Sequence, residues 1–192
     1  MAAQVQRMFV VPPVRQDFIF GVLRRTYNGM RNDTVEFARS KLFPIAPPPS
    51  AEPERAWQPT AARYEVLLPN AMPDVLVDPK LLTETYEKEA KPRQTDLAIV
   101  VKLVLPAKSA IHVVWELARE FARQSFVVEL GLPAVLVLHA PGLSGMRNAN
   151  PMHVHAIVLA RQYENGFTEY STIAHDAAHE PLAAKWGRMR GD

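Results

Sequence analysis

Two short apolar segments rich in β-branched residues, separated by a polar loop, constrain the fold of this chain more than any other feature. The first runs from Pro133 to Ala140 and the second from His153 to Ala160. Residues 141–151 between them contain the glycines, asparagines and prolines that are typical of a connection. This pattern predicts two neighbouring antiparallel strands. The loop is long for a hairpin, and long loops inside compact domains are often functional.

Three histidines lie where these two strands meet the loop. His139 ends the first strand, and His153 and His155 open the second. Since side chains alternate along a strand, His153 and His155 point to the same face, roughly 7 Å apart at the backbone. If the strands pair directly, three neutral imidazoles gather at one end of one sheet face and form a site for a divalent metal ion. The alternative is that one histidine belongs to the core and two lie on the surface.

Composition limits the remaining choices. A chain of 192 residues suits one domain. The absence of cysteine excludes a disulfide scaffold and a thiolate zinc site, and it agrees with a cytoplasmic location. No apolar run reaches the roughly 18 residues of a membrane helix, so no membrane partner is expected. The net charge of +2 is small, so any nucleic-acid surface must come from local clustering of basic residues.

Residues 1–60 are expected to form a divergent N-terminal segment. Within it, residues 8–11 favour a short strand, and residues 17–30 have apolar side chains at the spacing of an amphipathic helix. A second short helix is expected over residues 32–42. Residues 44–60 are rich in proline and predict an extended arm.

Residues 61–192 are expected to form an α+β core that ends in a basic C-terminal tail. The sequence predicts strands at 61–68, 95–105, 133–140 and 153–160, and helices at 78–90, 109–124 and 176–189, with a turn at Asn165-Gly166. The last two strands follow each other without a helix. That order predicts a largely antiparallel central sheet with helices packed mainly on one face, a split βαβ arrangement.

From Tyr64 onward the chain resembles the MobA/MobL family of plasmid mobilisation relaxases, which are three-histidine nucleases of the HUH type. The matching segments follow in order: Tyr64 to Pro69, Leu81 to Glu89, Leu103 to Gln124, and finally His139 with Asn150 to His155 and Arg161. The resemblance covers roughly residues 60–170. Its most specific part is the set of three histidines with Asn-Pro and an arginine.

The resemblance implies a relaxase-like fold and a DNA-nicking function. Such enzymes nick one strand at a transfer origin, where a tyrosine hydroxyl attacks the scissile phosphate and becomes joined to the 5′ end. It implies a divalent metal ion (Mn, Mg or Zn) on His139, His153 and His155. Tyr27 is the candidate nucleophile, because it follows the first expected strand at about the family's distance. The implied partners are single-stranded DNA at the origin and accessory relaxosome proteins.

Basic residues, most of them near the two ends of the chain, are candidates for contacts with DNA phosphates. They are Arg24, Arg25, Arg31, Arg161, Lys185, Arg188 and Arg190, with Arg39 and Lys41 as further candidates. The alternative for most of them is an ordinary solvated surface charge.

Two other functions stay open at this point. The family usually carries acidic residues in the strand before its second Leu-Pro, whereas this chain has Val100, Val101 and Lys102, and Met152 is inserted before His153. These departures favour a catalytically decayed, relaxase-like DNA-binding module. Three histidines also do not name a reaction by themselves, so a metal-dependent hydrolase of small phosphoesters or amides is the third hypothesis.

Overall fold

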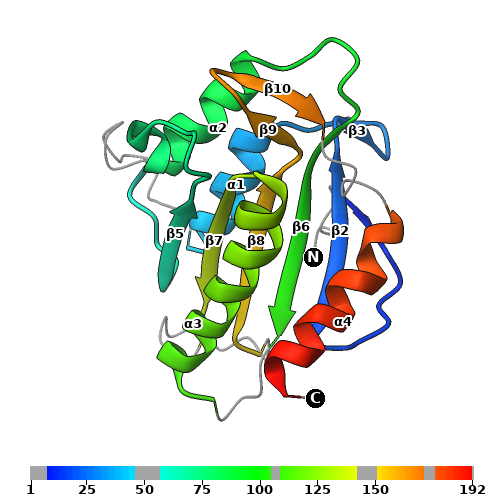
Figure 1. The fold of residues 1–192 in the computed structure, drawn as a ribbon, viewed down its shortest axis with the longest axis vertical. Coiled ribbons are helices and arrows are strands. Elements are labelled where there is room, and N and C mark those ends of the chain that lie inside the picture. Colours follow the sequence, from blue (N-terminus) through cyan, green and yellow to red (C-terminus); the bar gives the residue numbers. More distant parts are fainter. Residues whose placement is uncertain (1–7, 46–56, 105–108, 142–150, 171–175, 192) are drawn as a thin grey trace.

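A six-stranded antiparallel sheet forms the centre of the molecule, in a computed structural model that describes residues 8–45, 57–104, 109–141, 151–170 and 176–191 (Figure 1). The strands lie in the order β1-β2-β6-β8-β7-β5, and neighbouring strands are antiparallel. Their bounds, in that order, are Phe9–Val10, Phe18–Arg24, Asp96–Val104, His153–Leu159, Ala134–His139 and Arg63–Leu67. The predicted α+β class with an antiparallel central sheet is confirmed.

The α-helices of the described residues pack against both faces of this sheet (Figure 1). They are α1 (Thr34–Leu42), α2 (Pro79–Lys88), α3 (Ile111–Ala122) and α4 (His179–Arg190). One face is covered by α3 and α4, and the other by α1 and α2. The prediction that helices pack mainly on one face therefore differs from the structure. The reason lies in the central strands, since residues Leu97 to Val101 of β6 are each at most 1% exposed and need cover on both sides.

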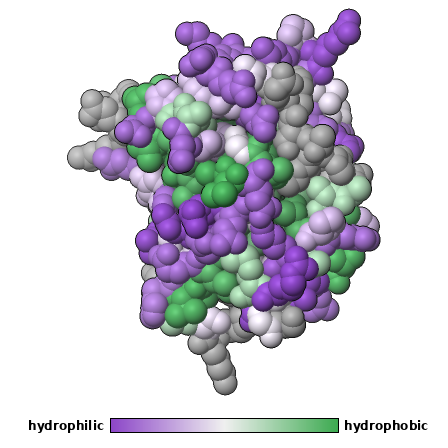
Figure 2. All heavy atoms as spheres, viewed as in Figure 1, coloured by the Kyte–Doolittle hydropathy of each residue, from purple (hydrophilic) through white to green (hydrophobic). Residues whose placement is uncertain are grey.

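A hydrophobic cluster on each face holds the helices to the sheet. On the first face, Trp115 of α3 and Trp186 of α4 are completely buried against the central strands. On the second face, Phe37 of α1 and Tyr86 of α2 are buried against the sheet. Seen from the side of α3 and α4, the outer surface is mainly hydrophilic, with smaller hydrophobic areas between (Figure 2). No helix in the described part of the chain is long and apolar enough to cross a membrane.

Residues 17–30 form a strand and a short hairpin, so the helix predicted there is wrong. β2 pairs with β6 along its whole length and places Phe18 and Phe20 in the cluster beneath α3. Gly21 meets β1 so closely that a Cβ atom there would lie 2.8 Å from the carbonyl oxygen of Phe9. Pairing on both edges of β2 overrides the local helical spacing. β2 consequently belongs to the same sheet as the strands that follow residue 60.

Two small hairpins extend beyond one end of the sheet (Figure 1). They are β3 (Thr26–Tyr27) with β4 (Met30–Arg31), and β9 (Arg161–Tyr163) with β10 (Phe167–Tyr170). Each turn is an Asn-Gly pair with positive φ, at Asn28 and at Asn165, which is the conformation that asparagine and glycine adopt most readily. The predicted turn at Asn165-Gly166 is confirmed.

Aspartate side chains cap the starts of α1 and α2. The Asp78 side chain accepts a hydrogen bond of 2.7 Å from the Leu81 amide and caps α2, as predicted. α3 continues without interruption as a π-helical segment, η3 (Arg123–Val128), where the sequence predicted a connection. Short 3-10 turns, η2 (Asp74–Val77) and η4 (Asp176–Ala178), precede α2 and α4. Most of the predicted proline-rich arm lies outside the described residues.

Candidate metal centre

The three histidines come from two strands that are direct neighbours. β7 pairs with β8 so that His139 lies opposite His153, while His155 lies opposite Val137. On β8, Val154 and Ala156 belong to the cluster beneath α3 and α4, so the histidines occupy the other face, the one covered by α1 and α2. The prediction that the strands pair directly is confirmed, and alternation along β8 explains the shared face.

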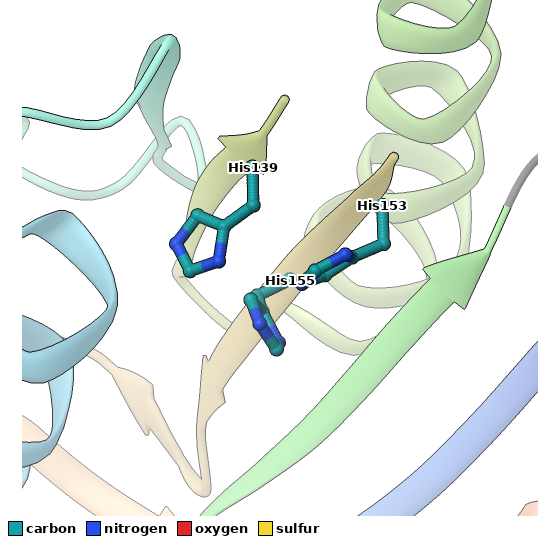
Figure 3. A group of neighbouring side chains, drawn as sticks. All are labelled: His139, His153 and His155. Carbon is teal, nitrogen blue, oxygen red and sulfur yellow. The ribbon is translucent and has the colours of Figure 1, made fainter. Parts of the chain in front are cut away.

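The imidazole rings converge on one another (Figure 3). The ring centroids of His139 and His153 are 5.1 Å apart, those of His139 and His155 are 4.9 Å apart, and those of His153 and His155 are 4.8 Å apart. One nitrogen from each ring can be chosen so that all three atoms lie within 4.8 Å of one another. The structure therefore brings together the three residues that the sequence named as metal ligands.

Backbone carbonyls fix the tautomers of two of these rings. His139 Nε2 lies 2.6 Å from the carbonyl oxygen of Lys41, and His153 Nδ1 lies 2.8 Å from that of Pro151. A carbonyl only accepts, so these nitrogens are the ones that carry hydrogen. His139 Nδ1 and His153 Nε2 are left with free lone pairs. Such supporting bonds are typical of metal-ligating histidines, and no side-chain pattern in the sequence could have revealed them.

Burial keeps the three imidazoles neutral. It lowers the pKa of His139, lowers that of His153 to about 4, and lowers that of His155 well below the ordinary value. The His155 Nδ1 atom is also buried and has no hydrogen-bond partner among the described residues. A buried nitrogen without a partner is costly unless something else binds the ring.

Two lysines supply the positive charge around the histidines. Lys102 lies on β6 directly opposite His155, and Lys41 lies in the last turn of α1. Both ammonium groups lower the pKa values of the histidines further, after the larger effect of burial. The surroundings of the rings are therefore positive, which is the sign that an anionic ligand requires.

The residues present fit a divalent cation. Three neutral imidazoles form a donor set that suits zinc, manganese and related ions. The fixed tautomers direct lone pairs of His139 and His153 away from the backbone, and the partnerless His155 nitrogen leaves that ring available. Lys102 opposes this fit, because a second positive charge so close weakens cation binding.

Tyr27 lies at the opposite end of the sheet. It belongs to the hairpin that follows β2. The last residue of β2, Arg24, pairs with Asp96 at the start of β6, whereas Lys102 near the end of β6 pairs with His155. Six residues of β-strand span roughly 20 Å. The Tyr27 ring packs edge-on against Phe9. The structure does not bring this tyrosine to the histidines.

The candidate DNA contacts are scattered, and most have carboxylate partners. Arg24 and Arg25 lie near the same hairpin as Tyr27, where they pair with Asp96 at 3.6 Å and with Glu87 at 2.6 Å. Lys185 and Arg190, on α4, pair with Glu129 and Asp17 on the sheet face opposite the histidines. Of the other candidates, Arg31, Arg39 and Arg188 are exposed, and Lys41 alone lies beside the histidines. These residues do not form one surface around the metal centre.

Arg161 is completely buried and presents no charge to solvent. Its guanidinium donates a hydrogen bond of 2.8 Å to the carbonyl oxygen of Glu89 and lies over the rings of Tyr86 and Phe167. It opens β9, just beyond the end of β8 and far from the histidines that open β8. This position gives Arg161 a packing role between α2 and the β9-β10 hairpin.

Comparison with solved structures finds a likeness in fold. No family model and no curated protein matches the chain. A solved structure described as "Molecular Basis of Vancomycin Resistance Transfer in Staphylococcus aureus" matches with a TM-score of 0.55 and 22% sequence identity, over 69% of each chain. The two proteins share a fold. At this identity the likeness shows the fold alone, and the histidine geometry must support any function.

Proposed function

We propose that this chain is a metal-dependent DNA relaxase that nicks one strand at a plasmid transfer origin in the cytoplasm. The observation that carries the proposal is the convergence of His139, His153 and His155 at the end of two paired strands, with lysine ammonium groups beside them. A cation site surrounded by positive charge suits a phosphodiester better than a neutral amide. The resemblance to mobilisation relaxases and the fold shared with a protein from work on resistance transfer support the same choice.

The chemistry needs a nucleophile, a charge-stabilising centre and a leaving group. A divalent cation held by the three histidines would polarise a phosphate oxygen and offset the negative charge that builds during the reaction. A tyrosine oxygen forms a bond to phosphorus, the bond from phosphorus to the 3′ oxygen breaks, and the phenolic proton ends on the released 3′ oxygen. The products are a 5′-phosphotyrosyl link and a free 3′ hydroxyl, and religation is the reverse.

Tyr64 is the tyrosine that the sheet places at the histidine end. It pairs with Val137 of β7, and Val137 pairs with His155 of β8, so the three residues form one row across the sheet. Two strand spacings, about 10 Å at the backbone, separate Tyr64 from His155. Tyr64 is 42% exposed. We therefore propose Tyr64 as the nucleophile, because Tyr27 would have to cross the length of the sheet.

Nicking of DNA tests the function. Supercoiled plasmid carrying a candidate transfer origin should be relaxed in the presence of Mn²⁺, Mg²⁺ or Zn²⁺. His153→Ala and His155→Ala should each abolish relaxation, whereas His112→Ala, an exposed histidine on α3, should leave it intact. Relaxation that survives both ligand substitutions, or that needs no divalent ion, would contradict a metal-dependent relaxase.

The covalent link tests the nucleophile. Mass spectrometry of the quenched reaction should find an oligonucleotide fragment on Tyr64, and Tyr64→Phe should lose both the link and the nick. Tyr27→Phe is the matched control and should keep both. A link on Tyr27 would show that the hairpin moves during the reaction, and a nick without any link would point to attack by water.

A DNA-binding module without chemistry is the second candidate. The distance of Tyr27 from the histidines and the lysine beside His155 favour it. Such a module would bind single-stranded DNA, alone or with accessory relaxosome proteins, and would form no covalent link with any metal. A third candidate, a metal hydrolase, would cleave small phosphoesters or amides and ignore DNA.

A further inference from the structure

Lys102 occupies an unusual place for a lysine. β6 pairs with β8 so that Lys102 lies directly opposite His155, and Val104 lies opposite His153. Directly opposed residues of antiparallel strands have Cβ atoms about 4.5–5.5 Å apart and share a face. On the other side of β6, Lys102 is paired with Ile19 of β2. The lysine therefore lies in the wall of the metal centre, with an apolar neighbour behind it.

The Lys102 side chain is half-buried. None of the ion pairs found between described side chains includes it, and burial lowers its pKa. A partly desolvated ammonium group gains most from a nearby anion, because the surrounding water no longer screens it fully. Lys41 adds a second positive charge from the end of α1. No carboxylate contributes to the charge that these histidines feel as far as the described residues go.

In this arrangement, the binding of a divalent cation and the binding of a phosphate group affect each other. A divalent cation on the histidines alone is repelled by Lys102. A phosphate group beside both charges is attracted by both, and it offsets the repulsion between them. The free energies of the two binding events are then linked, and each ligand must raise the affinity of the other by the same factor.

We propose that Lys102 forms the anion-binding half of a composite site, so that a divalent cation on His139, His153 and His155 and a phosphodiester on the Lys102 ammonium bind cooperatively. The proposal deepens the function proposed above and rests on it. It assigns to Lys102 a direct contact with the substrate phosphate. It also gives the metal centre a means to bind its ion tightly only when a DNA strand is in place.

Calorimetric titration of the full chain with Mn²⁺ tests the coupling, with and without a saturating single-stranded thymidine hexanucleotide. In the unmodified protein the oligonucleotide should lower the Kd for Mn²⁺ roughly tenfold, the effect expected when one unit charge near a divalent ion is offset across about 7 Å. Lys102→Met keeps much of the side-chain volume but removes the charge. It should bind Mn²⁺ alone roughly tenfold more tightly and show a clearly smaller gain with oligonucleotide, which comes from the direct attraction between cation and phosphate.

Two variants and two other ligands complete the test. Lys102→Arg should retain the coupling, and Lys80→Met, a partly exposed lysine on α2, should behave as the unmodified protein. If inorganic phosphate lowers the Kd for Mn²⁺ as much as the hexanucleotide does, the site binds free phosphate, and the proposal of a phosphodiester site is overturned. Thymidine without phosphate should give no coupling. Equal coupling in Lys102→Met and the unmodified protein overturns the proposal.

The outcome is separable from that of the proposed function. Absence of any Mn²⁺, Mg²⁺ or Zn²⁺ binding would remove both. Metal binding and nicking without coupling would leave the relaxase in place and remove only the role of Lys102. Thermal unfolding of each variant, expected within a few degrees of the unmodified protein, shows that the substitutions act on binding.

Discussion

At the scale of single residues, burial rather than charge pairing sets the properties of the metal centre. His153 and His155 are 5% and 7% exposed, and an imidazolium ion in such a position would lack hydration. The rings are therefore held in the neutral form that a cation requires. The sequence predicted the convergence of these three histidines from alternation and from direct pairing of the two strands, because strand geometry leaves few choices once two strands pair.

Depressed histidine pKa values predict how stability depends on pH. Between the unfolded value near 6.5 and the folded value of about 4 for His153, the unfolded chain binds more protons than the folded chain. Stability should consequently fall as the pH falls through this window, by roughly 2–3 kcal/mol for His153 alone. Urea unfolding of the metal-free protein at pH 7 and pH 4.5 measures it. His153→Asn should show a smaller loss, and His112→Asn an unchanged one.

Substitution of Arg161 separates a structural role of this residue from a contact with DNA. Arg161→Ala removes a completely buried side chain and its bond to the Glu89 carbonyl, so we expect a loss of roughly 3 kcal/mol in unfolding free energy. Affinity for Mn²⁺ should stay the same, since the residue lies at the other end of β8. Chemical denaturation and calorimetry measure the two quantities. A large drop in DNA affinity with unchanged stability would restore the contact that the sequence suggested.

At the scale of elements, α1 supports one histidine of the candidate metal centre and is itself held by α2. Its last turn supplies the Lys41 carbonyl that fixes His139, while its first turn is held by Glu87 of α2. Glu87 accepts hydrogen bonds from both the amide and the hydroxyl of Thr34, and it also pairs with Arg25. The position of α1 along the sheet therefore depends on a carboxylate at the far end of the helix from the histidine.

Glu87→Gln should weaken this support. The substitution removes a charged acceptor that three donors share, so we expect a loss of about 1–3 kcal/mol in stability. Metal affinity should fall several-fold, because groups that orient a metal ligand contribute to its affinity. The matched control is Glu84→Gln, an exposed residue on the same helix. If Glu87→Gln lowers stability without changing metal affinity, α1 does not position His139.

Prediction from sequence succeeded best where pattern and packing agree. Most strands and helices after residue 60 have strong periodicity, and Asp78 with Pro79 marks the start of α2. The helix predicted over residues 17–30 was wrong because the apolar residues there fit both a helical and a strand spacing. Only contact with β6, whose residues lie far along the chain, decides between the two. The backbone supports at Lys41 and Pro151 have no side-chain signature at all.

At the scale of the whole molecule, the two faces of the sheet do different work. The face with α3 and α4 is a packing surface, tied at its edge by Asp17, which accepts hydrogen bonds from Arg15, Trp186 and Arg190. Burial raises the pKa of Asp17, but hydrogen bonds from Arg15 and Arg190, together with the charge of Arg15 and a backbone hydrogen bond, lower it by more. The other face carries the candidate metal centre.

This division predicts the effect of removing Trp186. Trp186→Ala opens a large cavity against Phe121, whose ring centroid lies 5.4 Å away, and should cost roughly 3–5 kcal/mol. Affinity for Mn²⁺, measured below the new unfolding temperature, should remain within about twofold, since no histidine ligand touches this cluster. A much larger change in affinity would mean that the two faces are coupled through the sheet.

The bond between His139 and the Lys41 carbonyl joins residues that are 98 positions apart. The fixed tautomer of His139 therefore depends on the packing of α1 against the sheet, so the metal site is complete only in the folded chain. A cation that binds this site stabilises the folded protein over partly folded states by mass action. The free energy of unfolding rises by about 2.7 kcal/mol when the concentration of the cation is 100 times its Kd. A larger supply of that ion would then raise the fraction of molecules that stay folded.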